Sequence, residues 1–331
     1  MASSHAACSY LLKRLRNYSE HGLLVCYVAR ARAGTRAAVA VRSVGLHYNY
    51  CMEYALARTI TPAINVRYQR LIRRIQQLPP PGSRPLTVSG RVCGWVTAKA
   101  TSHLAGQLGV HIEPEAVHIN APSAPRLTID AVLARLAESL KDTGCLRGWR
   151  NELLDVVGEG KRLAVIERAA MRPLGLLTKA VHLNAWTPEG HLWVARRALD
   201  KSMDPGMWDT LVGGLACARE TLDLSLLRES NEEAGLLPEH LGDRSPLRII
   251  LRMHRRLPEG YQVEDVLVSD CVLDETVVPH NLDGEVCEFR CVSIDELWSM
   301  LEANEFTLEA ELVILEGLQK RIRDGVLRLP S

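Results

Sequence analysis

The sequence feature that most constrains the fold is a helical segment over residues 222–234 with three carboxylates on one face. At about 100° per residue, Glu229, Glu232 and Glu233 lie at positions i, i+3 and i+4 and share one side of the helix. Gly235 follows where a left-handed C-terminal cap would end the helix. The residues roughly opposite the carboxylates are apolar and are expected to face a core: Leu224, Leu227 and Ala234.

Three carboxylates on one helical face repel one another unless a cation lies between them. Mg²⁺ prefers oxygen ligands in octahedral geometry and shares its coordination sphere with water and substrate phosphates. A solvated acidic face is the plain alternative for the three glutamates alone. The surrounding residues favour a metal site, because Gly214 and Glu220 precede the helix and Arg228 lies in phase with the acids.

The stretch from Gly214 to Leu236 resembles the Nudix box, G-x5-E-x7-R-E-U-x-E-E-x-G-U, in which U is a bulky aliphatic residue. Every charged and glycine position of the box is matched in register. The first U position is the one departure, since Ser230 stands there, which predicts looser helix packing but removes no metal ligand. The resemblance implies a hydrolase that acts on diphosphates with Mg²⁺, or with Mn²⁺ as the alternative cation.

The resemblance also implies a set of metal ligands. Glu229 and Glu233, one helical turn apart, would be the principal ligands, and the carbonyl of Gly213 would add another. Nudix enzymes usually draw one more carboxylate from outside the box, and Glu285 is our choice because it leads into a strand. The competing carboxylates are Glu288 and Asp283.

Three further box residues would take part in catalysis. Glu232 would be a further ligand or would orient the attacking water. Arg228 would orient the carboxylates through charge-assisted hydrogen bonds, and Glu220 would support the loop or bind a second metal through water. The implied reaction is attack of a metal-activated water on one phosphorus of a diphosphate.

A second resemblance extends over nearly all of the chain after residue 60. It is to the thiamine pyrophosphokinase-related Nudix proteins, in which a small N-terminal domain of unassigned function precedes the hydrolase. It implies thiamine diphosphate, or its damaged analogues, as the substrate. The segments that carry it are residues 94–96, 179–184, 193–197, 205–209 and 211–214, together with Lys201.

Four residues before the box are candidates for binding the substrate. Arg196, Arg197 and Lys201 could bind the diphosphate as cations. For each of them, an equal alternative is that it is a solvated residue at a strand end. Trp208 could stack on a heteroaromatic ring, with a place in the core as its alternative. His182, on an apolar strand, is expected to be a core histidine rather than a ligand.

Two other functions compete with hydrolysis. Residues 197–206 also resemble part of isopentenyl diphosphate isomerase, but that enzyme needs a cysteine in a motif of its own, and Cys217 lies in the box loop without it. A non-catalytic Nudix module that binds a nucleotide or a partner would typically lose box glutamates, and none is lost here. Phosphate release with and without Mg²⁺ would distinguish these functions.

The order of the expected elements predicts an α/β class: a Nudix α/β/α sandwich with a mixed sheet, preceded by a small α+β domain. We expect a basic N-terminal tail at 1–58, the small domain at 59–172 and the hydrolase domain at 173–331. Before residue 172, helices are expected over residues 64–78 and 128–141, with a β-like segment at 86–96. After it, strands are expected over 180–186, 191–197, 247–253, 263–273 and 286–294, with helices over 221–234 and 308–323.

Composition and charge exclude several partners. The formal net charge of +1 gives no field that favours nucleic acid or an anionic membrane, and no apolar run approaches the roughly 20 residues that span a bilayer. Nine scattered cysteines indicate reduced thiols in a cytoplasmic compartment. The first 50 residues contain one acid, Glu20, among many arginines, a composition that resembles a transit peptide; a poorly ordered tail is the plainer interpretation. A small-molecule diphosphate is therefore the expected partner.

Overall fold

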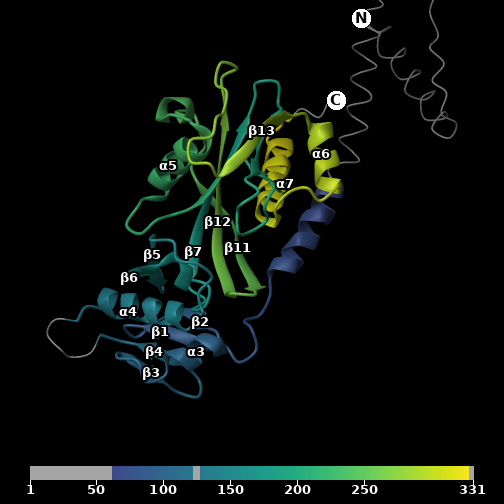
Figure 1. The fold of residues 1–331 in the computed structure, drawn as a ribbon. Helices are drawn as coiled ribbons and strands as arrows, with labels where there is room; N and C mark the ends of the chain where they lie inside the picture. The colour runs from purple at the N-terminus through teal and green to yellow at the C-terminus, as the bar shows by residue number, and fades with distance from the viewer. Residues whose placement is uncertain (1–61, 122–126, 328–331) are drawn as a thin grey trace, which may run out of the picture. The chain divides into compact units, whose positions relative to one another are not determined.

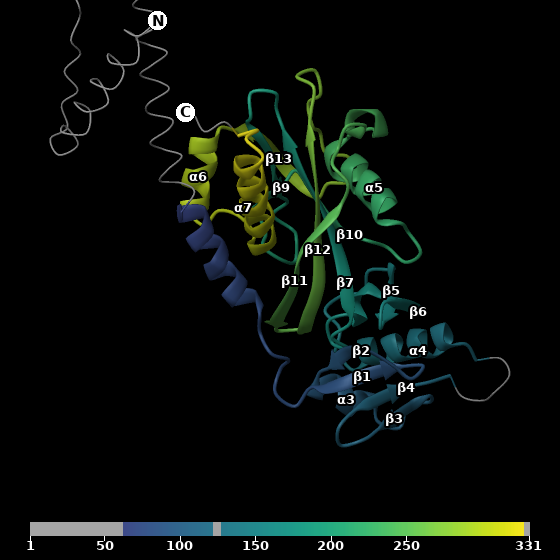
Figure 2. The same cartoon turned by 180° about the vertical axis from the view of Figure 1, so that it is seen from behind.

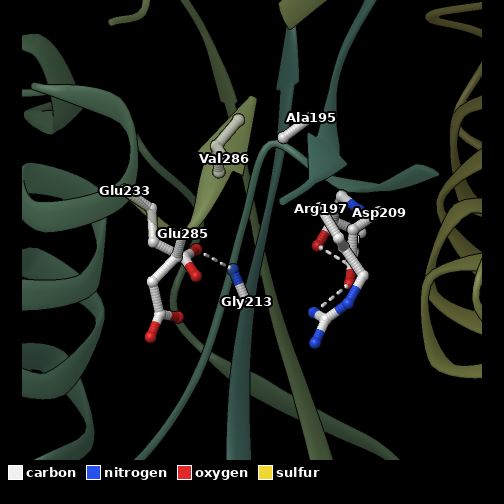
Figure 3. Close-up of a pocket in the computed structure, with 8 residues that line it drawn as sticks. Ala195, Arg197, Asp209, Gly213, Glu233, Glu285 and Val286 are labelled. Atoms are coloured by element: carbon white, nitrogen blue, oxygen red, sulfur yellow. Dashed lines mark hydrogen bonds and ion pairs between the residues drawn. The ribbon is translucent and has the colours of Figure 1, made fainter. Parts of the chain in front are cut away.

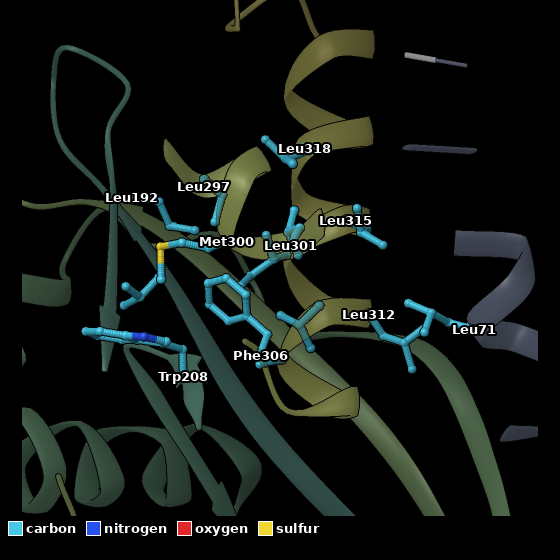
Figure 4. Close-up of a cluster of buried hydrophobic side chains, with 14 of the residues drawn as sticks. Leu71, Leu192, Trp208, Leu297, Met300, Leu301, Phe306, Leu312, Leu315 and Leu318 are labelled. Carbon is cyan, nitrogen blue, oxygen red and sulfur yellow. The ribbon is translucent and has the colours of Figure 1, made fainter. Parts of the chain in front are cut away.

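The structure is a computed structural model that describes residues 62–121 and 127–327. The predicted basic tail therefore lies outside the described residues. The first described element is a helix over residues 62–75, which confirms the helix expected before the proline run. Its buried residues belong to the same hydrophobic cluster as helix α7 (Leu308–Arg323), and Figure 4 shows Leu71 facing Leu312. This first helix thus contributes to the core beside α7.

The next segment forms a four-stranded sheet with two helices. Strands β1 (Arg84–Val88) and β2 (Arg91–Val96) form an antiparallel hairpin, so the β-like segment expected over 86–96 contains a turn. Ser89 and Gly90 occupy this turn with φ of 50° and 76°, the left-handed region that glycine tolerates best. The remaining strands are β3 (Val110–Ile112) and β4 (Val117–Ile119), and the sheet order is β2-β1-β4-β3.

Helices α3 (Ala98–Leu104) and α4 (Ile129–Asp142) pack with this sheet. The side chain of Thr128 caps α4 by accepting a hydrogen bond from the amide of Ala131, which confirms the helix expected from residue 128. A separate hairpin, β5 (Leu153–Gly158) with β6 (Lys161–Glu167), follows α4, and a short 3₁₀ turn (Arg168–Ala170) ends it. The two helices, the small sheet and this hairpin share one hydrophobic cluster.

The second half of the described chain is built on a seven-stranded sheet. Its main order is β11-β12-β7-β8-β13, with β10 paired to β7 and β9 paired to β8. The long strands β7 (Leu177–Trp186) and β12 (Gly260–Val272) run parallel, whereas the other pairs are antiparallel, so the sheet is mixed as expected. The other strands are β8 (Leu192–Arg197), β9 (Trp208–Thr210), β10 (Val212–Leu215), β11 (Arg248–Leu257) and β13 (Val286–Val292).

Helices cover both faces of this sheet, as Figures 1 and 2 show. Helix α5 (Leu222–Ala234) packs on one face through a cluster that includes Leu226. Helices α6 (Ile294–Glu302) and α7 pack on the other face through the cluster drawn in Figure 4. The predicted α/β/α sandwich is confirmed, while the domain boundaries predicted at 58 and 172 stay predictions.

The sequence did not reveal α6, because the strand expected over 286–294 was extended too far. The strand ends at Val292, and the side chain of Ser293 then accepts a hydrogen bond from the amide of Glu296, which caps the new helix. Within the residues that the structure describes, no helix is long and apolar enough to cross a membrane.

Candidate active site

Helix α5 is capped at both ends, and its sequence predicted the C-terminal cap. The hydroxyl of Thr221 accepts a hydrogen bond from the amide of Leu224, and Gly235 ends the helix with φ of 63°. A side chain at 235 would also overlap the ring of His280, so glycine is needed there for space as well as for conformation. These caps fix the ends of the helix and thereby the positions of its acids.

The buried face of α5 contains Leu226, whereas the sequence predicted Leu224. Leu224 is 53% exposed, so its expected place in the core is wrong. Leu226, Ser230 and Ala234 are fully buried instead, which follows from their spacing of four residues along one side of the helix. Ser230 therefore occupies a core position, and its hydroxyl has no hydrogen-bond partner among the described residues.

Arg228 connects the box acids. Its Nε donates to Glu220 at 3.0 Å, and its Nη1 donates to Glu229 at 2.9 Å and to Glu232 at 3.0 Å. The hydrogen bond from Arg228 is the main cause that lowers the pKa of Glu220. The hydroxyl of Ser225 also donates to Glu220, at 2.8 Å. One guanidinium thus fixes three carboxylates, an arrangement that matches the orienting role expected for Arg228.

Two glycines of β10 allow two of the acids to approach the sheet. The amide of Gly213 donates to Oε2 of Glu233 at 2.8 Å. A Cβ atom at Gly214 would overlap the carboxyl group of Glu229. Glu233 is only 7% exposed. Both carboxylates are therefore held against the β10 backbone, where any larger residue at 214 would displace one of them.

Burial makes the charged forms of Glu229 and Glu233 unfavourable. Burial raises the pKa of Glu229 to about 7, and the positive charge of Arg228 opposes this rise. Burial also raises the pKa of Glu233; the Gly213 amide opposes this rise, and the negative charges of Glu229, Asp209 and Glu285 add to it. Neighbouring acids that raise the pKa of Glu233 in this way favour a divalent cation, which would neutralise several of them together.

A small pocket lies beside Glu233 at the end of strands β8, β9 and β10. Figure 3 shows its lining residues, with Glu233 and Glu285 on one side of Gly213 and the Arg197–Asp209 pair on the other. The full lining is Ala195, Arg197, Asp209, Thr210, Gly213, Glu233, Glu285 and Val286. It contains Gly213, Glu233 and Glu285 of the ligands that the sequence predicted, while Glu229 reaches the same β10 backbone at Gly214.

The pocket distinguishes Glu285 from Glu288 and Asp283, the two competing candidates for the carboxylate outside the box. Glu285 lines it, whereas Glu288 pairs with Arg196 at 3.3 Å and Asp283 accepts a hydrogen bond from the amide of Glu285. Burial would raise the pKa of Glu285, but its ion pair with Lys201 holds that pKa below its usual value. The geometry supports Glu285 as the outside carboxylate.

Asp209 is an acidic group of the pocket that the sequence reasoning missed. It is paired with Arg197 at 3.1 Å, and burial raises its pKa against the charges of Arg197 and His182. Its position directly after Trp208, in a segment already singled out by resemblance, was the available signal. His182 is buried, and its Nδ1 lies 3.0 Å from the hydroxyl of Thr210, so it is a core histidine.

The structure gives the four predicted substrate-binding residues different surroundings. Arg197 lines the pocket and is paired with Asp209, while Lys201 is paired with Glu285, which lines the pocket. Arg196 pairs with Glu288 and donates from Nε to the carbonyl of Gly206. Trp208 is 5% exposed within the cluster of Figure 4, which agrees with the core alternative and leaves little surface for stacking on a substrate.

The donor set fits a hard divalent cation. Glu229, Glu233 and Glu285 offer carboxylate oxygens, the ligands that Mg²⁺ prefers. In the part of the chain that the structure describes, no three acidic, histidine or cysteine side chains already converge on one point. Arg228 and Lys201 occupy oxygens of Glu229 and Glu285, so metal binding here requires these side chains to give up part of their contacts.

Comparisons with known proteins match part of this chain to a protein family. Residues 177–312 match the model of the NUDIX domain, so this part of the chain contains a Nudix domain. The chain is similar to Nudix hydrolase 24, chloroplastic, of Arabidopsis thaliana, at 31% identity over 60% of this chain and 55% of that protein. It is equally similar to Nudix hydrolase 20, chloroplastic, of the same plant, over 60% of this chain and 54% of that protein. The chain thus spans about half the length of these relatives.

Solved structures also show similarity to this chain. One is DR0079 from Deinococcus radiodurans, at 22% identity with a TM-score of 0.38, covering 50% of this chain and 98% of that one. Another is the Nudix domain of NrtR from Shewanella oneidensis, solved with ADP-ribose, at 16% identity with a TM-score of 0.33 and covering 44% of this chain and 88% of that one.

Proposed function

We propose, from the Nudix domain at residues 177–312, that this protein is a Mg²⁺-dependent pyrophosphohydrolase that cleaves the diphosphate linkage of a small organic diphosphate. The observation that carries the proposal is that two acids of α5 lie against neighbouring glycines of β10, Glu233 at the Gly213 amide and Glu229 against Gly214. Glu285 lines the pocket beside Glu233. Buried acids that repel one another form a poor structural core, but they form a good site for a divalent cation.

In this function the three glutamates would hold the metal. A bound Mg²⁺ would supply charge to stabilise phosphate oxygens and would lower the pKa of a water molecule. The Gly213 amide orients Glu233, and Arg228 orients Glu229 and Glu232. Glu232 is 46% exposed, which leaves it free to accept a proton or to orient water. Since phosphoryl transfer depends on positioning and charge stabilisation, loss of one ligand should be severe.

For the substrate we propose a nucleoside diphosphate derivative. This class rests on the match to the Nudix domain and on the named Nudix hydrolases among the relatives. The finer assignment to thiamine diphosphate rests on sequence resemblance alone, so it serves as one member of the substrate panel. Arg197 lines the pocket and Lys201 pairs with Glu285, which lines it. Lys201 is suited to contact a phosphate oxygen once Glu285 binds metal, and Arg197 has further N–H donors beside its pair with Asp209.

The cysteine of the box loop gives no support to isomerase chemistry. Burial, together with the neighbouring Glu152, raises the pKa of Cys217 to about 12, so its thiol stays protonated near neutral pH. Its Sγ lies 3.3 Å from Glu152 and 3.2 Å from Arg228, as part of the loop's packing. Hydrolysis therefore remains the better proposal.

A substrate screen tests the proposed function directly. Purified protein would be incubated with Mg²⁺ and a panel of nucleoside diphosphate sugars, dinucleotides, NADH, ADP-ribose, thiamine diphosphate and its oxidised analogues, and the products identified. We expect Mg²⁺-dependent release of two monophosphates from at least one nucleoside diphosphate derivative. Binding of panel members with no turnover at any metal concentration would favour the non-catalytic module.

A further inference from the structure

The region before the Nudix domain contacts two loops that flank the candidate active site. The contacts come from the open end of the β5–β6 hairpin, where the chain enters β5 and leaves β6. Here the amide of Arg168 donates to the carbonyl of Glu152, and the amide of Arg150 donates to the side chain of Glu167. Arg150, Glu152 and Arg168 are thereby fixed beside one another.

The first flanking loop is the box loop that precedes α5. The amide of Ala218 donates to the carbonyl of Leu153 at 2.8 Å, so the loop follows the start of β5. A chain of side-chain contacts then leads to the acids: Arg168 to Glu152 at 2.6 Å, Glu152 to Cys217 at 3.3 Å, and Cys217 to Arg228 at 3.2 Å. Arg228 itself holds Glu229.

The second flanking loop follows β8 and contains Lys201. Nη2 of Arg150 donates to the hydroxyl of Ser202 at 3.0 Å, and Nη2 of Arg147 lies 3.4 Å from the carbonyl of Ser202. Lys201, the residue before Ser202, pairs with Glu285 at the pocket. Among the described residues, Arg147 and Arg150 make these contacts without an acidic partner.

Arg168 and Arg150 are the cations that this end of the hairpin brings to the two flanking loops. Arg168 reaches the box loop through Glu152, and Arg150 contacts Ser202, the neighbour of Lys201. The Arg168 side chain is 40% exposed, so its guanidinium still has surface to offer a ligand.

We propose that the β5–β6 hairpin end forms part of the substrate site, where Arg168, assisted by Arg150, binds phosphate oxygens of the diphosphate. The inference rests on the proposed function and extends it. A guanidinium presents several N–H donors in a planar fork, so Arg168 can keep Glu152 while it binds a phosphate oxygen. The region before the Nudix domain thereby gains a role in substrate binding.

The test compares Arg168→Ala with a matched variant of the same hairpin, Arg162→Ala. Arg162 lies on β6 at an exposed position. Loss of a charge-assisted hydrogen bond to phosphate should raise KM about tenfold or more in Arg168→Ala. Arg168→Lys should recover part of the loss, because it keeps the charge without the fork. Arg162→Ala should leave KM unchanged.

A second comparison distinguishes phosphate binding by Arg168 from structural support of the box loop. Glu152→Gln removes the same ion pair from its other end but leaves the charge of Arg168 in place. If Arg168 only braced the box loop, the two variants would lose activity equally, and that result would overturn the proposal. We expect Glu152→Gln to change KM far less than Arg168→Ala. Thermal unfolding of each variant would show that the fold persists.

Direct binding makes the inference independent of turnover. Methylenediphosphonate, which cannot be hydrolysed, would be titrated into wild-type protein and variants with Mg²⁺ present. We expect about tenfold weaker binding for Arg168→Ala than for wild type or Arg162→Ala. Equal binding by all three would reject the phosphate site. Binding that depends on Arg168 in a protein that hydrolyses nothing would reject the proposed function and keep the site.

Discussion

Gly214 on β10 lies so close to the carboxyl group of Glu229 on α5 that a Cβ atom at position 214 would overlap it. The glycine is thus a spacer that sets how closely the acidic helix approaches the sheet. It gives a physical reason for a glycine at this position that is independent of any turn.

The first prediction concerns this contact. Gly214→Ala should displace Glu229 and lower kcat/KM on the order of a hundredfold, because misplacing a catalytic group by about 1 Å can cost that much. The Mg²⁺ concentration for half-maximal activity should rise as well. Gly242→Ala is the matched control, since a Cβ there meets nothing closer than 3.8 Å. Wild-type kinetics for Gly214→Ala would show that Glu229 is not a metal ligand.

The second prediction concerns the most buried acid of the site. Glu233→Gln should lower kcat on the order of a hundredfold or more, because one ligand of the metal loses its charge. Its thermal stability without metal should be equal to or above wild type, since a buried charge is removed. Glu239→Gln, an exposed acid after α5, serves as the control. Near-wild-type turnover by Glu233→Gln would reject the metal site.

The third prediction uses two buried serines of the same helix. The hydroxyl of Ser230 has no hydrogen-bond partner in the described part of the chain, whereas that of Ser225 donates to Glu220 at 2.8 Å. Ser230→Ala should therefore raise the free energy of unfolding by about 1 kcal/mol, and Ser225→Ala should lower it by a similar amount. Chemical denaturation of both variants would measure this. Equal losses in the two would mean that Ser230 is satisfied in solution.

The fourth prediction concerns pH and a carboxyl group away from the pocket. Burial, with the charge of Glu309, raises the pKa of Glu264 to about 7, while hydrogen bonds from Thr178 and Gln262 oppose this. The folded state therefore binds the proton more tightly than the unfolded state, whose pKa lies near the ordinary 4.5. The resulting stabilisation is complete below pH 4.5 and is lost as pH rises through about 7.

Thermal unfolding of metal-free protein between pH 5 and pH 8 would check the contribution of Glu264. Glu264→Gln cannot titrate, so its Tm should fall less over this range than that of wild type. The difference should be about 2–4 °C for each kcal/mol that the titration removes. Glu239→Gln should follow the wild-type curve. Parallel curves for Glu264→Gln and wild type would contradict the raised pKa.

The sequence predicted the elements whose signals are local. The end of α5 followed from Gly235, and strands were expected over residues 180–186 and 263–273, where the structure has β7 and β12. The buried face of α5 was misjudged because two leucines, at 224 and 226, compete for it. Only contact with the sheet decides which leucine is buried, and the helical spacing of apolar residues does not reveal that contact.

The parts of the site that escaped prediction depend on pairs distant in the sequence. Lys201 meets Glu285 across the loop that follows β8, and Arg197 meets Asp209 through the β8–β9 pairing. Lys201 and Arg197, which were expected to be available for substrate phosphate, are therefore paired with acids. The role proposed for the end of the β5–β6 hairpin could not be predicted either, because its arginines carry no motif. Only the fold brings Arg168 near the box loop and Arg150 to the loop after β8.

The helix over residues 62–75 has a consequence for the order in which the molecule is made. Its buried residues Ile64, Leu71 and Ile75 share a cluster with Leu312 and Leu315 of α7, which the ribosome releases much later. Until α7 emerges, this helix lacks part of the apolar cluster in which it is buried, and nascent chains with exposed apolar faces are prone to aggregate. Burial of residues 62–75 is therefore completed only by a segment that is synthesised much later.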